Sequence, residues 1–278
     1  MKLTRILLCQ DSLEGILSAV HEAYVSRYGL HDIRIELMGQ PAQTEMFSEY
    51  REIVTDTSAA AKVALAVRKK ISKRAFDMIF NASCADNPKK AHAIYRFIVG
   101  GFYMGAQIEN YLSEPSVQLV MQLSRQVSKE ADHLFGFLRF EDIGGKLLLA
   151  RIRPRHWLLY QLADHFTERF PKERFIICDV GRKRACLHIP GKPVRMVDYS
   201  GMEEQDGENM PMIDAIRAAA AGAGRGGAQM PSAKDDYETL WKAFFRTIMI
   251  KERENPRCQM NMMPKRYWDY MPEMEGKK

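Results

Sequence analysis

The residues best suited to acid–base chemistry lie in LADHFTERF and in the apolar run RFIICDV that follows it. Histidine is the side chain best suited to proton transfer near neutral pH, so the His165 imidazole is a candidate general base. Asp164, Glu168 or Asp179 would then orient the imidazole or activate a water molecule. A histidine in an amphipathic helix is more commonly a packing residue, so the catalytic and structural interpretations both stay open.

A second chemistry, phosphate binding, is suggested by RIRPR, in which Arg151, Arg153 and Arg155 alternate. On a strand these residues would share one face, because successive side chains point to opposite sides. Guanidinium groups so arranged repel one another unless an anion lies among them, and phosphate accepts their forked hydrogen bonds. A solvated face with acidic neighbours elsewhere is the alternative. Further residues expected to contact phosphates are Arg139, Arg169, Arg182, Lys183, Lys265 and Arg266.

The stretch ENPRCQMNMMPKRYWDYMPE, residues 254–273, mixes methionines, aromatic residues and cations. Methionine and aromatic side chains at such spacing usually pack in a core. Aromatic rings beside cations are also typical of surfaces that bind single-stranded nucleic acid. The sequence therefore predicts a C-terminal clasp with a basic edge, in which Tyr267 or Trp268 could stack on a base.

These residues need elements to position them, and the first half of the chain is predicted to be α/β and then helical. LTRILLC reads as a buried strand, followed by a helix for which Ser12 is the expected N-cap. Residues 33–38 and 50–56 alternate like strands. A basic amphipathic helix is expected at about 57–71, capped by Thr57 or Ser58, and its cations form a second candidate electrostatic footprint. Later helical segments are expected to break at Asn87-Pro88, Gly100-Gly101 and Glu114-Pro115.

The pattern changes at His133. Two strands joined at Gly144-Gly145, a helix and two more strands predict a β-β-α-β-β unit. The fold class is therefore α+β, with a mostly antiparallel sheet, packed helices and a helical middle segment. The predicted segments of one globular domain are 1–132 (α/β and helical), 133–199 (the β-β-α-β-β unit), 200–234 (a Gly/Ala-rich flexible insertion) and 235–278 (a final helix and clasp).

Composition narrows the function classes. The net charge of +6 and the pI near 9.0 favour an anionic partner such as nucleic acid. No apolar run is long enough for a membrane span, and five scattered cysteines predict a cytoplasmic protein without a disulfide framework. No cysteine or histidine pair has metal-ligand spacing, and GAGRGG lies in a low-complexity stretch, so neither a metal nor a cofactor is expected.

Several motifs, in order, resemble a bacterial family of uncharacterised proteins described as DNA metabolism or DNA repair proteins. They are CQDSLEGILSAVHEAYVSRYG, HLFGFLRF, LARIRP, LADHFTERFP and WKAFFRTIMIKERENPRCQMNMMPKRYW. The resemblance covers about residues 3–199 and 235–273. Many relatives carry an acidic residue where this chain has Arg153 and Arg155, so the arginine stripe is particular to this protein.

The resemblance implies a role with DNA, because relatives are typically encoded beside a radical-SAM DNA modification or repair protein. A similar domain also occurs fused to uracil-DNA glycosylase-like domains. It attaches no catalytic role to any residue, and whether this protein is an enzyme stays open.

Three hypotheses follow. The first is a DNA-binding accessory to a radical-SAM repair or modification enzyme, which would carry the cofactor. The second is a hydrolytic DNA-acting enzyme, a glycosylase or nuclease, that uses His165 with a carboxylate. The third is a protein-interaction module that does not bind DNA.

Overall fold

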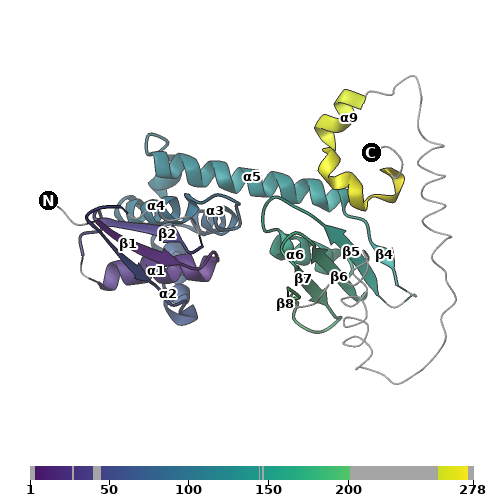
Figure 1. Ribbon diagram of the computed structural model, residues 1–278, viewed down its shortest axis with the longest axis horizontal. Coiled ribbons are helices and arrows are strands. Elements are labelled where there is room, and N and C mark those ends of the chain that lie inside the picture. The colour runs from purple at the N-terminus through teal and green to yellow at the C-terminus, as the bar shows by residue number, and fades with distance from the viewer. Residues whose placement is uncertain are drawn as a thin grey trace. The chain divides into compact units, whose positions relative to one another are not determined.

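The computed structural model describes residues 4–26, 28–39, 45–143, 145, 147–200 and 256–274. The chain divides into two compact units, each with its own sheet (Figure 1). The first unit comprises Met1–Glu130 and the short segment Arg155–Trp157, and the second comprises Ala131–Pro154 and Leu158–Lys278. Three residues from the middle of the second unit's sequence therefore belong to the first unit.

The first unit is built on a three-stranded parallel sheet. Its strands are β1 (Thr4–Cys9), β2 (Ile33–Leu37) and β3 (Ser48–Glu52), in the order β2-β1-β3. Helix α1 (Leu13–Val25) follows β1 and begins as predicted at Ser12, whose Oγ accepts the Gly15 N–H at 3.0 Å. A Cβ at Gly15 would lie 2.4 Å from the Gln10 carbonyl oxygen, so only glycine lets the helix start this close to β1.

The remaining elements of this unit are helical. They are α2 (Thr57–Lys70), α3 (Lys73–Ser83), α4 (Lys90–Met104), the 3-10 helix η1 (Gly105–Asn110) and most of α5 (Pro115–Phe137). Helix α2 packs against α1, and α4 packs against β2. The N-cap of α2 is Asp56 rather than Thr57 or Ser58, because its Oδ1 accepts the N–H groups of Ser58 and Ala59 at 2.8 and 3.2 Å.

Helix α4 corrects another prediction, because it runs through Gly100-Gly101 without a break. A Cβ at Gly101 would lie 2.3 Å from Ile71 Cδ1, so the glycine admits a buried neighbour rather than ending the helix. Close packing outweighs the low helix propensity of glycine here.

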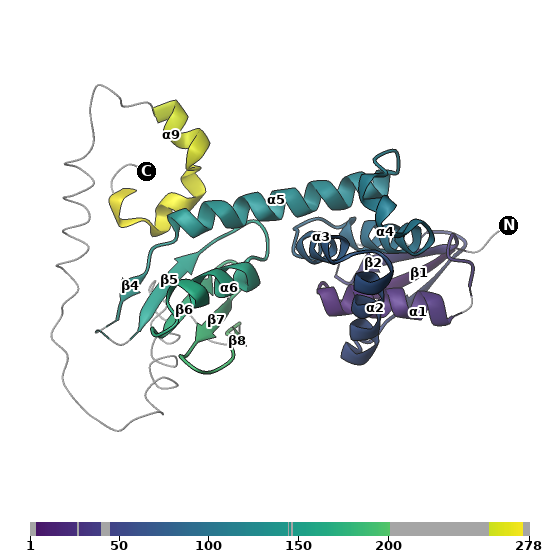
Figure 2. The same ribbon diagram turned by 180° about the vertical axis from the view of Figure 1, so that it is seen from behind.

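The second unit contains a five-stranded sheet in the order β4-β5-β6-β7-β8. Strands β5 and β6 are parallel, and the other three pairings are antiparallel. Helix α6 connects β5 to β6 and lies against the sheet (Figure 2). The element bounds are β4 (Glu141–Asp142), β5 (Leu148–Ile152), α6 (Leu159–Arg169), β6 (Phe175–Asp179), β7 (Arg184–His188), β8 (Arg195–Asp198), α9 (Pro256–Met262) and the 3-10 helices η3 (Lys265–Tyr270) and η4 (Pro272–Met274).

The α+β class is confirmed, with a mostly antiparallel second sheet, although the first sheet is entirely parallel. The antiparallel strand pair predicted after His133 is present as β4 and β5, but its first strand begins later than predicted, because α5 continues to Phe137 and only Glu141–Asp142 pair as β4. Leu134 and Leu138 are both buried, and this spacing of four is that of a helix. The stretch HLFGFLRF is apolar throughout, so its helical period is hard to distinguish from strand alternation.

The third strand predicted for the first unit lies at 48–52 rather than 50–56, and Val54 beyond it is 88% exposed. The flexible insertion at 200–234, beyond Ser200, and the helix expected from Asp235 lie outside the described residues. Within the described parts, no helix is both long and apolar enough to cross a membrane.

Candidate nucleic-acid interface

The arginine stripe predicted for RIRPR does not form on one strand face. Strand β5 ends at Ile152, since Pro154 lacks the N–H that the ladder requires. Arg151 stays in the strand and pairs with Glu141, Nη2 to Oε2 at 2.9 Å. Arg153 lies exposed beyond the strand end, and Arg155 belongs to the first unit. Only Arg151 and Arg153 remain together at the carboxyl end of β5.

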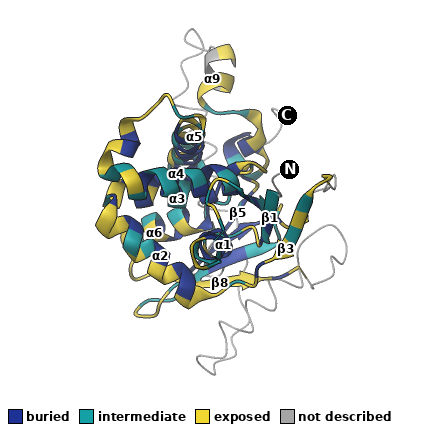
Figure 3. Ribbon diagram, turned by 90° about the vertical axis from the view of Figure 1, so that its left-hand side faces the viewer, coloured by how far each residue is buried: buried dark blue, intermediate teal, exposed yellow. Residues whose placement is uncertain are grey.

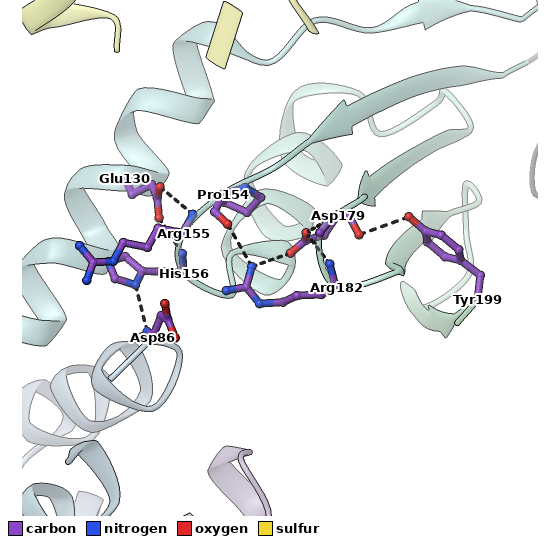
Figure 4. Close-up of polar contacts among 9 residues, drawn as sticks. Asp86, Glu130, Pro154, Arg155, His156, Asp179, Arg182 and Tyr199 are labelled. Carbon is purple, nitrogen blue, oxygen red and sulfur yellow. Dashed lines mark hydrogen bonds and ion pairs between the residues drawn. The ribbon is translucent and has the colours of Figure 1, made fainter. Parts of the chain in front are cut away.

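Asp179 and Arg182 form a clamp at the end of β6 (Figure 4). Asp179 Oδ1 accepts the N–H groups of Gly181 and Arg182 at 3.1 and 3.2 Å. Its Oδ2 pairs with Arg182 Nη1 at 3.0 Å, and Nη1 also donates to the Pro154 carbonyl at 3.1 Å. The Tyr199 hydroxyl donates to the Asp179 carbonyl at 3.2 Å. Burial raises the pKa of Asp179, and Arg182 opposes that rise.

This clamp shapes the turn between β6 and β7. Both oxygens of the Asp179 carboxylate are engaged by the turn itself, so the predicted catalytic candidate acts here as a structural acceptor. Arg182 is predicted to contact phosphate, but its Nη1 donates to Asp179 Oδ2 and to the Pro154 carbonyl within this clamp. Lys183 occupies the tight turn with a left-handed φ of 52°.

His165 lies on α6 but is not assembled with an acid. Its ring stacks on Phe135, with centroids 4.1 Å apart and planes 18° apart, and meets Phe166 edge-on at 4.9 Å. Asp164 and Glu168 are exposed, and among the described residues neither forms a hydrogen bond or ion pair with His165. The structure thus brings none of the predicted carboxylates onto this histidine, which packs among aromatic rings.

The C-terminal segment packs as a clasp. Tyr267 and Trp268 are 5% and 7% exposed. The ring of Tyr267 contacts those of His133 and Phe137 at centroid distances of 6.2 and 5.9 Å. Trp268 Nε1 donates to the Met263 carbonyl at 3.0 Å. The burial of both rings argues against the predicted stacking of a base on Tyr267 or Trp268.

The basic residues around the clasp divide into anchors and exposed cations. Arg139 is an anchor, since its Nε and Nη2 bind the buried Glu273 Oε1 at 3.0 and 2.7 Å. Arg266 is exposed, yet its Nη2 donates to the Tyr267 hydroxyl at 2.7 Å. Lys265 is exposed and lies 5.7 Å from the Trp268 ring centroid. Arg169 is exposed at the end of α6.

Tyr270 brings the C-terminal segment close to the arginines at the end of β5. Helix η3, which carries Lys265 and Tyr270, packs against β5. Burial raises the pKa of Tyr270, while the charges of Arg153 and Arg151 lower it. The hydroxyl thus lies within electrostatic reach of both arginines. Sequence reasoning did not select Tyr270, although it shares a face with Tyr267, three residues before it on a 3-10 helix.

Sequence reasoning also missed a buried polar cluster in the first unit (Figure 4). The Glu130 carboxylate accepts the N–H groups of Arg155 and His156 at 3.0 and 2.8 Å. His156 Nδ1 accepts the Asp86 N–H at 3.1 Å, which fixes this nitrogen as unprotonated. Nearby, the buried Lys90 Nζ binds Asp11 Oδ1 at 2.6 Å and the Ala85 carbonyl at 2.7 Å.

That cluster has a structural explanation. Glu130 and His156 tie the Arg155–Trp157 segment to the first unit, and the Trp157 N–H donates to the Cys84 carbonyl at 2.9 Å. The partners lie far apart in sequence, so no local signal predicts them. Within the described residues, no group of His, Cys, Asp and Glu side chains could hold a metal ion.

The fold and these contacts define a two-unit α+β protein whose second unit gathers cations around the carboxyl end of β5. The chain belongs to the family described as a domain of unknown function, DUF4130, which it matches over residues 88–273. The match includes the whole second unit up to Glu273 and the helices α4 and α5. A comparison with curated proteins found no match.

Proposed function

We propose that this protein binds DNA through its second unit and acts as an accessory to a radical-SAM DNA repair or modification enzyme. The family resemblance of its ordered motifs supports the DNA context and the partner. The basic composition supports an anionic ligand.

The observation that carries the proposal is the packing of η3 on β5. It places η3, which begins at Lys265, against β5, and Arg153 lies just beyond the end of that strand, more than a hundred residues earlier in the sequence. Both cations are exposed, and neither has an ion-pair partner within the described parts of the chain. Exposed cations from separate elements can contact successive phosphates of a DNA strand. Each contact favours binding, because it releases condensed counterions.

The cysteines support placing the cofactor chemistry on a partner. Cys9, Cys84, Cys178 and Cys186 are buried. Iron–sulfur clusters are held by cysteine side chains gathered around the metal, and within the described residues no group of three or more His, Cys, Asp and Glu side chains could hold a metal ion. The radical-SAM enzyme would therefore supply the cluster, and this chain would hold the DNA.

The test is fluorescence anisotropy of the full chain with labelled single-stranded and duplex DNA across a salt series. The double variant Arg153→Gln/Lys265→Gln should lower the slope of log affinity against log salt by about 1.4 to 1.8, because each of the two lost phosphate contacts removes about 0.7 to 0.9. Lys172→Gln/Arg174→Gln is the matched control. It removes two exposed cations just before the amino end of β6 and should leave affinity nearly unchanged.

Equal losses in the two double variants would indicate a diffuse charge effect and reject this interface. Absence of binding by the wild-type chain at low salt would reject direct DNA binding. A stable complex with the neighbouring radical-SAM protein in that case would instead favour the protein-interaction module. The accessory role itself predicts co-elution of the two proteins in size-exclusion chromatography.

A further inference from the structure

The first unit carries a concentration of positive charge that the proposed interface does not use. Five of the seven residues 68–74, RKKISKR, are Lys or Arg. They span the end of α2 and the start of α3, and we call them the α2–α3 corner. All five cations are exposed, and much of α2 is coloured as exposed in Figure 3.

The backbone of the α2–α3 corner is fixed even though its cations are exposed. Ile71 is buried against Gly101, and Ser72 caps α3 by accepting the Ala75 N–H at 2.8 Å. The Ser72 hydroxyl also donates to the Glu109 carboxylate. A fixed backbone sets the spacing of the positions from which the cations extend, so binding an extended anion does not have to order this part of the backbone.

Local acids leave most of this charge uncompensated. Arg74 reaches Glu109 at 3.5 Å, and the Arg68 guanidinium lies 3.9 Å from the Phe76 ring centroid. Lys69 and Lys73 have no ion-pair partner among the described residues. Like charges gathered this closely on a surface repel one another. A bound polyanion would relieve that repulsion.

An exposed aromatic ring adjoins these cations. Tyr103 is 94% exposed, more than any other large hydrophobic side chain in the described ranges. Its neighbours in the chain lie against α2: Lys70 Nζ is 5.4 Å from the Phe102 ring centroid, and a Cβ at Gly105 would lie 3.8 Å from the Lys70 carbonyl oxygen. Tyr103 therefore sits beside the end of α2 with its ring in solvent.

We propose that the α2–α3 corner and Tyr103 form a binding site for single-stranded DNA. Lys69, Lys70 and Lys73 contact successive phosphates, and an unpaired base stacks on the Tyr103 ring. An aromatic platform beside a row of cations suits single strands, because a duplex keeps its base faces covered. The inference rests on the DNA binding in the proposed function and adds a separate contact in the first unit.

The experiment uses the full chain and a fluorescein-labelled single-stranded oligonucleotide, with the corresponding duplex as the competing probe. Tyr103→Ala should weaken single-strand binding by roughly 10-fold and duplex binding far less, since stacking accounts for the loss. Tyr103→Phe keeps the ring and should bind like the wild type. Tyr111→Ala is the control aromatic, since Tyr111 is 46% exposed just after η1.

Charge is tested with Lys69→Gln/Lys70→Gln/Lys73→Gln. This variant should lower the single-strand salt slope by about 2, at 0.7 for each lost contact. Lys89→Gln/Arg125→Gln/Lys129→Gln removes three exposed cations elsewhere in the first unit and should leave the slope unchanged. Thermal unfolding of each variant should match the wild type, because every changed side chain is exposed.

The outcomes separate this site from the proposed interface. If Arg153→Gln/Lys265→Gln weakens binding while the corner and Tyr103 variants do not, the proposed function stands and this inference is overturned. Equal losses for single-stranded and duplex probes with Tyr103→Ala would also overturn it. If the wild-type chain binds no DNA at low salt, both proposals fail together. Loss with Tyr103→Ala, retention with Tyr103→Phe and a silent control would support the site.

Discussion

Two regions of this protein have similar composition and opposite exposure. The C-terminal η3 segment, KRYWDY, places cations beside Tyr267 and Trp268, and both rings are buried. The α2–α3 corner places cations beside Tyr103, whose ring is 94% exposed. In η3 the Tyr267 ring packs against His133 and Phe137 of α5. At the corner the Tyr103 ring lies in solvent, which leaves its faces free for the base stacking that we propose.

The comparison shows that cations next to aromatic residues do not by themselves indicate nucleic-acid binding. A ring must present a free face, and burial decides that. In η3 both rings take part in packing within the protein: Trp268 Nε1 donates to the Met263 carbonyl, and Tyr267 contacts α5. The cations then extend from a segment that is already anchored.

The largest difference between the two regions is expected when one ring is removed from each. Trp268→Ala should lower the free energy of unfolding by about 3–5 kcal/mol, because it empties a buried aromatic site. Tyr103→Ala should change it by less than about 0.5 kcal/mol, because the ring is in solvent. Urea unfolding of both variants measures the difference. Similar stabilities for the two would show that the C-terminal segment is not a clasp.

The second test concerns the arginines of the second unit. Arg182→Gln should cost about 2 kcal/mol at neutral pH, because the buried Asp179 carboxylate loses its charged partner. Arg184→Gln is the control, since its partner Asp198, at 3.2 Å, is exposed on the surface. Chemical unfolding at neutral pH compares the two variants.

The pH dependence of the Arg182→Gln loss follows from the sign of the Asp179 shift. Burial raises the folded-state pKa of Asp179 above its ordinary 3.8, so ionisation destabilises the fold as pH rises through the folded pKa. Arg182 offsets that cost. Below the ordinary pKa the carboxyl is neutral in both states, so the variant should lose less there. A loss independent of pH would assign Arg182 a packing role instead.

Local signals in the sequence predicted much of the fold. The N-cap at Ser12 and the buried strand 175–179 follow from side-chain hydrogen bonding and apolar runs, which short windows reveal. The end of α5 is not predicted, because a stretch that is apolar throughout shows neither a helical nor a strand period. The Gly100-Gly101 pair wrongly predicts a break, because the residue that packs on Gly101 is Ile71, the C-cap of α2, which lies far from it in the sequence.

The candidate site was harder to predict, because its parts meet only in three dimensions. The arginine stripe failed at Pro154, a local rule that the sequence already displayed. The approach of Tyr270 to Arg153 depends on η3 packing against β5, and the Glu130 contacts with Arg155 and His156 bridge more than twenty residues. Burial of Tyr267 and exposure of Tyr103 likewise depend on tertiary packing.

A third test sharpens what holds the α2–α3 corner in place. Gly101→Ala should lower the free energy of unfolding by about 1–2 kcal/mol, because the added Cβ would overlap with Ile71. The cost of this overlap should exceed the gain in helix propensity. Gly136→Ala is the matched control in α5, where a Cβ would meet nothing within 4 Å. It should be neutral or stabilising by up to about 1 kcal/mol. Thermal unfolding distinguishes them, and a neutral Gly101→Ala would mean that Ile71 can move aside.

The smallest effect is expected for the cations themselves. Lys265→Ala removes an exposed ammonium 5.7 Å from the Trp268 ring centroid, and Lys70→Ala removes one 5.4 Å from that of Phe102. Each should cost about 0.5 kcal/mol or less, as expected for long cation–π contacts at exposed sites. Urea unfolding with replicate precision of a few tenths of a kcal/mol is sufficient.

Equal, small losses of unfolding free energy for Lys265→Ala and Lys70→Ala would show that neither lysine stabilises the fold. The two regions would then differ in the burial of their aromatic rings, and both lysines could contact a ligand. If Lys265→Ala instead cost more than about 1.5 kcal/mol, well above the exposed-site range, Lys265 would be part of the clasp. The proposed interface of the second unit would then keep Arg153 but lose its C-terminal cation. The α2–α3 corner would in that case be the stronger candidate for phosphate contacts, because its lysines extend from helix ends that do not depend on them.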